Sequence, residues 1–193
     1  MRVEILLEEP SMEEVLKNVL PKILPEGYNL DENVFLRPHN GKSDLKKSIP
    51  NKVRAFSKYY EPVKIIILHD QDNVPDCKYL KNNILDLCKD EQNNFYLPCL
   101  VRIVCQELES WYIGDLNAIE KAYPNFKSDK YKNKKEFRTP DRIEKPSQTM
   151  KHILPNFQKI QTAKDVSKYM DINNNKSESF GFFISGIQEF LKQ

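Results

Sequence analysis

Residues 63–72 read VKIIILHDQD, a run of β-branched and aliphatic side chains that ends in two aspartates. A nearly continuous apolar run of this kind is typical of a strand buried on both faces, as in a parallel sheet covered by helices. Shorter runs predict three further strands, at residues 3–7 (VEILL), 33–37 (NVFLR) and 97–105 (LPCLVRIVC). Stretches with helical periodicity separate the strands, and parallel strands need such crossovers. The order βαβαβαβ therefore favours an α/β fold.

Helices are expected between the strands and after the last one. The first follows Pro10, with Ser11 as its N-cap and Glu14 completing a capping box. Apolar stripes predict further helices at residues 44–60 (interrupted or kinked near Pro50), 76–88, 115–122, 146–154, 162–170 and 178–191. We therefore expect an α/β core of residues 1–125. A basic loop and a C-terminal helical extension, residues 126–193, should pack on it as one compact unit.

The composition excludes several classes of protein. Aromatic residues make up 10% of the chain and its apolar residues fall in compact runs, which argues against disorder. No apolar run approaches 18 residues, and the N-terminal MRVEILLEEPS lacks the continuous apolar core of a signal peptide. We therefore expect no membrane span and a cytoplasmic location. The four cysteines show no CxxC spacing, which argues against structural zinc and for free thiols in a reducing compartment.

A net charge of +2 is low for a dedicated nucleic-acid-binding protein, so any such role must depend on local clusters. The richest cluster is residues 127–138, KSDKYKNKKEFR. Its lysines are candidate contacts to a polyanion backbone, with a solvated loop as the alternative interpretation. The candidate lysines are Lys130, Lys132, Lys134 and Lys135.

Carboxylates follow three of the predicted strands at the point where each strand ends. They are Glu8 and Glu9, Asp70 and Asp72, and Glu107 and Glu109. The carboxyl ends of parallel strands share one edge of the sheet, and ligands of such sheets bind there. We therefore expect the carboxylates to converge, although polar loops alone would also place acids at these positions.

Electrostatic repulsion indicates what such a cluster requires. Two carboxylates about 4 Å apart repel by about 1 kcal/mol in water and by about 4 kcal/mol at an effective dielectric constant of about 20. No lysine or arginine lies beside Asp70 or Asp72 in the sequence. A hard cation that prefers oxygen ligands, Mg²⁺ or Mn²⁺, is the natural counter-charge. The predicted ligands are Glu8, Asp70 and Asp72, and Glu107 or Glu109 completes a second metal site.

Other polar residues are weaker candidates. Lys42 and Lys47 lie near a predicted helix N-terminus, where they would contact a phosphate or act only in capping and solvation. His69 adjoins the aspartates, but strand alternation directs it away from Asp70 and favours a packed neutral histidine over a general base. Trp111 and Tyr112 are interpreted as core or lid aromatics in preference to base-stacking platforms.

A strand that ends in glutamate, followed by a later strand that ends in Asp-x-Asp, resembles the Toprim pattern of topoisomerases, primases and OLD-family nucleases. Longer stretches are similar to the Toprim-like bacterial family known as domain of unknown function 4276. These stretches are LLEEPSMEEVLKNVLPKIL, GKSDLKKSIPNKVRAF, HDQDNVPDCKYLK, RIVCQELESWYIGDLNAIEKAYP and NNNKSESFGFFISGI. The resemblance covers nearly the whole chain and implies a Toprim-like parallel sheet with a C-terminal helical extension.

The resemblance also implies roles for individual residues. Glu8 matches the Toprim glutamate, with Glu9 where a glycine usually follows, and Asp70 and Asp72 match the Asp-x-Asp pair. Further acids match the uncharacterised family without an assigned role, namely Asp76, Glu107, Glu109 and Asp115. Because related families often accompany ATPases in anti-phage defence modules, the resemblance implies a defence effector or an accessory subunit.

Two functional hypotheses follow. In the first, the protein is a metal-dependent nuclease that cuts DNA or RNA. Asp70 and Asp72 hold Mg²⁺ or Mn²⁺, and Glu8 is a metal ligand or a general acid or base. In the second, it is a non-catalytic regulatory or interaction subunit that binds an ATPase partner. A phosphoacceptor domain of the receiver type ranks third, because Asp-x-Asp is not its usual arrangement.

Overall fold

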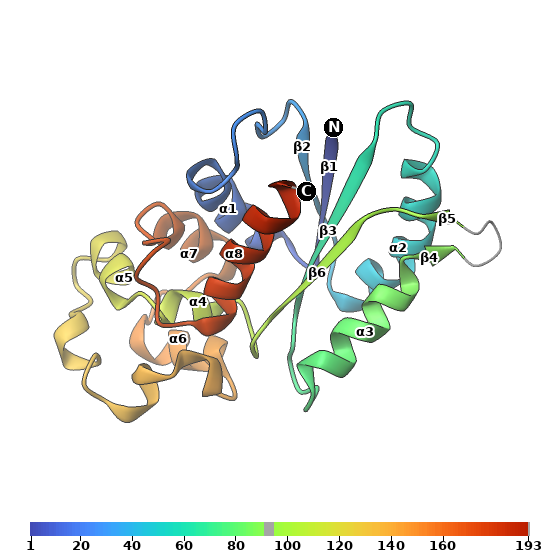
Figure 1. The fold of residues 1–193 in the computed structure, drawn as a ribbon. Coiled ribbons are helices and arrows are strands. Elements are labelled where there is room, and N and C mark those ends of the chain that lie inside the picture. The colour runs from blue at the N-terminus through green and yellow to red at the C-terminus, as the bar shows by residue number, and fades with distance from the viewer. Residues whose placement is uncertain (91–94, 193) are drawn as a thin grey trace.

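A computed structural model of the chain describes residues 1–90 and 95–192. Its main sheet is parallel throughout, with strand order β2-β1-β3-β6. The strands are β1 (Arg2–Leu7), β2 (Val34–Pro38), β3 (Val63–Asp70) and β6 (Cys99–Val104). Helices cover both faces of the sheet (Figure 1). The predicted α/β class, with a parallel sheet covered by helices, is confirmed, and it is consistent with a Toprim-like fold.

The central strand explains why the sheet forms as it does. Every residue of β3 is buried, because β1 and β6 pair with its two sides and helices cover its two faces. The register aligns Leu7 with Leu68 and Asp70 with Val104. The residues that follow β1, β3 and β6 therefore lie along one edge of the sheet, as the sequence predicts.

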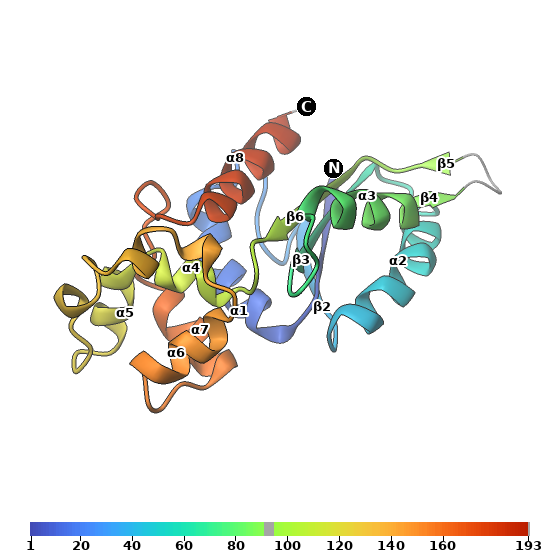
Figure 2. The same cartoon turned by 90° about the horizontal axis from the view of Figure 1, so that it is seen from below.

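Strand alternation sends side chains into two separate hydrophobic clusters. One face of the sheet, including Ile65 and Ile67, packs against α2 (Lys42–Phe56) and α3 (Cys77–Leu87). The other face, including Ile66 and Leu68, packs against α1 (Pro10–Val19) and the C-terminal helices. Figure 2 shows the two helical layers on opposite sides of the strands. Among the described helices, none combines the length and the apolar character that crossing a bilayer requires.

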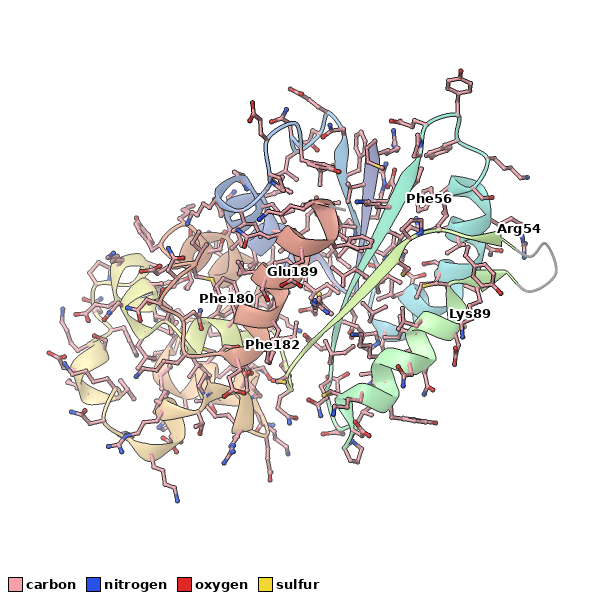
Figure 3. All side chains as sticks on the ribbon, viewed as in Figure 1. Arg54, Phe56, Lys89, Phe180, Phe182 and Glu189 are labelled. Carbon is pink, nitrogen blue, oxygen red and sulfur yellow. The ribbon has the colours of Figure 1, made fainter. Side chains whose placement is uncertain are left out.

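The C-terminal helical region belongs to the same core as the sheet. Its helices are α4 (Glu109–Ile113), α5 (Leu116–Ala122), α6 (Pro146–Ile153), α7 (Lys159–Ser167) and α8 (Glu178–Lys192). Trp111 of α4 packs edge-on against Phe180 and at a tilt against Phe183 of α8, at ring-centroid distances of 5.0 and 5.1 Å. Of the labelled α8 aromatics in Figure 3, Phe180 is buried and Phe182 is 66% exposed. One cluster thus contains residues from both predicted segments, 1–125 and 126–193.

Several local predictions need correction. Ser11 is not the N-cap of α1: the cap is Glu9, because Pro10 fits the first helical position, where no backbone N–H is needed. Glu9 has an extended backbone (φ −149°), so this turn does not require the glycine usual in the Toprim pattern. Pro50 lies inside α2 without ending the helix.

The sequence prediction also missed short elements. The five-residue helix α4 was not anticipated, nor were β4 (Lys89–Asp90) and β5 (Phe95–Tyr96), which pair antiparallel. In addition, α7 begins at Lys159, earlier than the predicted start at residue 162. The last difference matters for the functional site.

Candidate functional site

Three of the predicted carboxylates meet at the carboxyl edge of the sheet. Glu8 follows β1, Asp70 ends β3, and Glu109 opens α4 beyond the end of β6. Their exposed fractions are 8%, 3% and 0%, so all three are buried. They lie close enough for Glu8 and Glu109 to repel Asp70. Figure 2 views the molecule from below, from the side on which these strands end.

Glu8 is held by β3. Its Oε2 accepts a hydrogen bond from the backbone N–H of Asp70 at 2.9 Å and lies 3.0 Å from Nδ1 of His69. Burial by itself raises the pKa of Glu8, but the contact with His69, the Asp70 N–H and the charge of Lys159 outweigh burial and lower it. Glu8 is therefore ionised at neutral pH, which suits a metal ligand or a proton acceptor.

His69 orients Glu8 from inside the core. Its side chain is buried, and its Nδ1 lies 2.5 Å from the backbone oxygen of Asp70 as well as near Glu8. Both neighbours of Nδ1 are acceptors, so this nitrogen carries a hydrogen. Strand alternation predicts a packed histidine on the opposite face from Asp70. It does not show that the ring contacts Glu8, which follows the neighbouring strand β1.

Most of the buried side-chain polar atoms that lack a partner among the described residues belong to this cluster, and Nε of Arg102 is the exception. Those in the cluster are Oδ1 of Asp70, both carboxylate oxygens of Glu109, the hydroxyl of Tyr112 and Nε2 of His69. Each is buried and has no hydrogen-bond partner among the described residues. Because buried polar groups are nearly always paired, several unpaired ones together indicate a place that a ligand, an ion or ordered water completes.

Burial and mutual repulsion shift the titration of these acids. Burial raises the pKa of Asp70 well above its ordinary value, and repulsion by Glu8, Glu9 and Glu109 raises it further. Burial likewise raises the pKa of Glu109 to about 7, against the opposing charge of Lys159. Without a cation, burial and repulsion therefore favour the protonated form of Asp70, and a pKa of about 7 leaves Glu109 about half protonated at neutral pH. A cation that displaced these protons would gain two carboxylate ligands.

Lys159 supplies a positive charge that sequence analysis missed. It is the first residue of α7, and its Nζ lies 2.6 Å from Oε2 of Glu9. Burial alone lowers the pKa of Lys159, but Glu109 and Glu9 more than reverse the effect and raise it. The side chain is 42% exposed, so its ammonium group reaches the acids from the surface.

The donor set fits a hard cation that takes few protein ligands. Within residues 1–90 and 95–192, no group of three or more His, Cys, Asp or Glu side chains is arranged to hold a metal ion. Mg²⁺ often uses only one or two carboxylates, with water and phosphate filling its other positions. Asp70 and Glu109 offer that number of carboxylates with unpaired oxygens. A closed cage of protein ligands, as zinc prefers in structural sites, does not fit.

The backbone is unusual where β3 and β6 end. Asp72 (φ 52°) and Gln106 (φ 62°) both adopt the left-handed conformation, which is uncommon for residues other than glycine. The N–H of Asp72 donates to the backbone oxygen of Gln106 at 2.7 Å, which ties the two turns together. Such conformations cluster at functional sites, where the surrounding structure holds them in place.

The remaining predicted acids have partners of their own, although Glu107 also lies close enough to Glu109 to raise its pKa. Asp72 forms an exposed ion pair with Lys42 at 3.2 Å, and Glu107 accepts a hydrogen bond from the N–H of Ser147 at 2.7 Å. Asp76 caps α3 by accepting from the N–H of Lys78. Asp115 caps α5 and also accepts from the N–H of Asp171. These contacts give Asp76 and Asp115 structural roles, and Glu107 as a metal ligand stays a prediction.

The predicted phosphate-binding lysines are not gathered around the acids. Lys47 is an exposed residue of α2, and the lysines of the basic segment are also exposed, namely Lys130, Lys132, Lys134 and Lys135. In both views, the segment with the short helices η2 (Ser128–Lys130) and η3 (Lys135–Arg138) lies at the end of the helical region farthest from the sheet (Figures 1 and 2). Any role for this segment in binding a polyanion is therefore separate from the carboxylate cluster.

Comparison with protein families places the chain. The family model described as domain of unknown function (DUF4276) matches residues 7–188, which is nearly the whole chain. The chain belongs to the DUF4276 family. Comparisons with curated proteins and with solved structures give no match. In this DUF4276 member, the matched region includes Glu8, Asp70, Glu109 and Lys159.

Two residues of the DUF4276 site had weak sequence signals. Lys159 lies far from the acids in sequence, and only the packing of α7 against α1 and α5 brings it near them. Tyr112 follows Glu109 by three residues, a spacing that puts both on one face of a helix, but a helix of five residues is too short to show periodicity.

Proposed function

We propose that this protein is a Mg²⁺- or Mn²⁺-dependent phosphodiester hydrolase that cleaves DNA or RNA. One observation carries the proposal: buried carboxylates with unpaired oxygens converge at the carboxyl edge of a parallel sheet. Acids at this edge are suited to holding a cation against a phosphate group. The Toprim resemblance of Glu8 and the Asp-x-Asp pair supports the same reaction class, and it is the basis for proposing a relation to Toprim nucleases.

Each residue has a distinct role in this proposal. Asp70 and Glu109 hold the cation, which supplies Lewis-acid polarisation of the phosphate when it is bound. Glu8, ionised and fixed by Asp70 N–H and His69, is a further ligand or accepts a proton from the attacking water. Lys159 approaches from the exposed side, where its ammonium group can leave Glu9 and donate to a phosphate oxygen.

A cleavage assay with designed variants tests the proposal. Purified protein is incubated with labelled single-stranded and duplex DNA and RNA, with Mg²⁺, Mn²⁺ or a chelator. We expect metal-dependent cleavage of at least one substrate, reduced by about a hundredfold or more in Asp70→Asn and Glu109→Gln. Asp86→Asn is the matched control, because Asp86 is an exposed acid of α3 outside the cluster. Full activity in Asp70→Asn would contradict the proposal.

A second function, a non-catalytic subunit that binds an ATPase, is favoured by the position of Lys159. Its ammonium group offsets part of the negative charge, and the raised pKa values of Asp70 and Glu109 favour their uncharged forms, so the cluster depends less on a metal as counter-charge. Under this hypothesis, neither Mg²⁺ nor Mn²⁺ raises the melting temperature, and no substrate is cleaved by folded protein. Both results together would replace the hydrolase with the binding subunit.

A further inference from the structure

A pair of thiols lies at the opposite end of β6 from the carboxylates. The Sγ atoms of Cys88 and Cys99 are 3.1 Å apart, and Cys99 donates its thiol hydrogen to the sulfur of Cys88. Cys88 donates in turn to the backbone oxygen of Ile84 at 3.4 Å. All four cysteines of the chain are free thiols in this structure. We propose that Cys88 and Cys99 form a reversible intramolecular disulfide, a redox modification site that is independent of the proposed hydrolase.

The scaffold holds both sulfurs firmly in place. Cys88 is the C-cap residue of α3, and Cys99 is the first residue of β6, paired in register with Ile65 of β3. The helix α3 packs directly against β6, Cys88 belongs to the cluster of buried side chains between them, and Cys99 packs against that cluster. A disulfide bond is about 2.05 Å long, so the sulfurs need to approach by only about 1 Å. We expect a small side-chain rotation to close this distance.

An oxidant can reach the pair from one side. An open pocket of about 530 Å³ adjoins both cysteines and is also lined by Leu85, Lys89 and Tyr96. Cys88 is 6% exposed, whereas Cys99 is half-buried and is the more exposed residue of the two. Figure 3 labels Lys89, the residue after Cys88, where α3 ends. The other two cysteines, Cys77 and Cys105, lie near each other, but the only thiol–thiol hydrogen bond among the described residues joins Cys99 to Cys88, which makes Cys77 and Cys105 internal controls.

The reaction needs an oxidant of the disulfide class, such as oxidised glutathione. One cysteine thiolate attacks the R–S–S–R bond, forms a mixed disulfide and releases one thiol. The second cysteine then attacks the protein sulfur of the mixed disulfide and releases the second thiol. Two protein thiols lose two hydrogens, and the small disulfide gains them. The hydrogen bond to Cys88 and burial raise the pKa of Cys99, which keeps its thiolate scarce and slows reaction with weak oxidants.

Mass spectrometry after oxidation tests the proposal. The folded protein is incubated with oxidised glutathione at pH 8, acid-quenched, alkylated and digested. We expect a linked pair of peptides containing Cys88 and Cys99, with Cys77 and Cys105 still alkylated, and full reversal by dithiothreitol. The link closes a short loop, so the melting temperature of the oxidised protein should rise by about 5–10 °C. Four alkylated cysteines, or a link that involves Cys77 or Cys105, would overturn the proposal.

Variants separate this site from general cysteine reactivity. The double variant Cys77→Ser/Cys105→Ser retains the pair and should lose two thiols on oxidation, as the wild type does. Cys99→Ser should form no internal link and should show no rise in melting temperature. Circular dichroism shows whether Cys99→Ser folds. If it does not fold, the double variant still tests the proposal, because a double variant that forms no Cys88–Cys99 link contradicts it. Hydrolase activity is not used as a readout, so each proposal can fail alone.

Discussion

The two ends of the sheet bury their carboxylates in opposite ways. Glu4 of β1 is fully buried, yet its Oε1 accepts from Nε of Arg2 at 2.7 Å and its Oε2 accepts from Nε of Arg37 at 2.8 Å. Glu109, equally buried near the other end, has no hydrogen-bond partner for either oxygen within the described chain. Burial alone therefore does not mark a functional acid. A buried acid whose oxygens remain unpaired does, because the fold gains nothing from it.

The largest expected effect is a loss of stability in Glu4→Ala. Removing one partner of a buried ion pair typically costs about 3–5 kcal/mol, because the remaining charges stay partly buried without compensation. Arg2 and Arg37 retain some contact with water, so we expect about 3 kcal/mol, or about 10 °C in melting temperature. The measurement is urea or thermal unfolding followed by circular dichroism.

The matched variant is Glu109→Gln, which removes an equally buried charge that has no hydrogen-bond partner among the described residues. We expect its free energy of unfolding to stay within about 1 kcal/mol of the wild type or to rise, as is common when a destabilised functional group is removed. Equal losses in Glu4→Ala and Glu109→Gln would erase the contrast between the two ends.

Metal binding gives the next effect. Saturation at about a hundredfold excess over the dissociation constant stabilises the folded state by about 2.7 kcal/mol. We expect Mg²⁺ or Mn²⁺ to raise the melting temperature of the wild type by about 5–10 °C, and not that of Asp70→Asn. Glu4→Gln is the control, because Glu4 is a buried acid outside the cluster. A rise that persists unchanged in Asp70→Asn would place the metal elsewhere.

The pH dependence of stability tests Glu109 without a metal. Its pKa is raised from 4.5 to about 7 by burial, so the folded state binds more protons than the unfolded state between these values. Stability from this group is present below about pH 4.5 and is lost as the pH rises through 7. In a chelator, the wild type should lose about 2 kcal/mol between pH 5 and 7 relative to Glu109→Gln. Parallel curves for the two proteins would show that Glu109 titrates normally.

The sheet and the location of the site could be predicted because both depend on short-range patterns. The apolar run of β3 predicts a central strand, and the rule that parallel strands end at one edge predicts that Glu8 and Asp70 meet there. Neither inference needs side-chain geometry, only strand direction.

The rest of the site depends on long-range packing and local backbone geometry. Lys159 reaches the acids only because α7 docks against α1, a contact that no sequence spacing indicates. Whether Glu107 or Glu109 is buried beside Asp70 depends on where α4 begins, and the sequence does not predict this short helix. At Asp72 a left-handed residue directs the side chain toward Lys42, and strand alternation does not extend past that turn.

The smallest expected effect concerns Asp72, the second acid of the Asp-x-Asp pair. Its ion pair with Lys42 joins side chains that are 28% and 58% exposed, and such pairs contribute less than about 1 kcal/mol. Asparagine tolerates the left-handed backbone, so Asp72→Asn tests the charge alone. We expect little change in melting temperature, and a smaller loss of metal-induced stabilisation than in Asp70→Asn. Lys42→Met distinguishes the alternatives, because freeing Asp72 would tighten metal binding if Asp72 were a ligand. Equal defects in Asp72→Asn and Asp70→Asn would show that the ion pair breaks when the metal binds, and both acids of the sequence motif would then belong to the site.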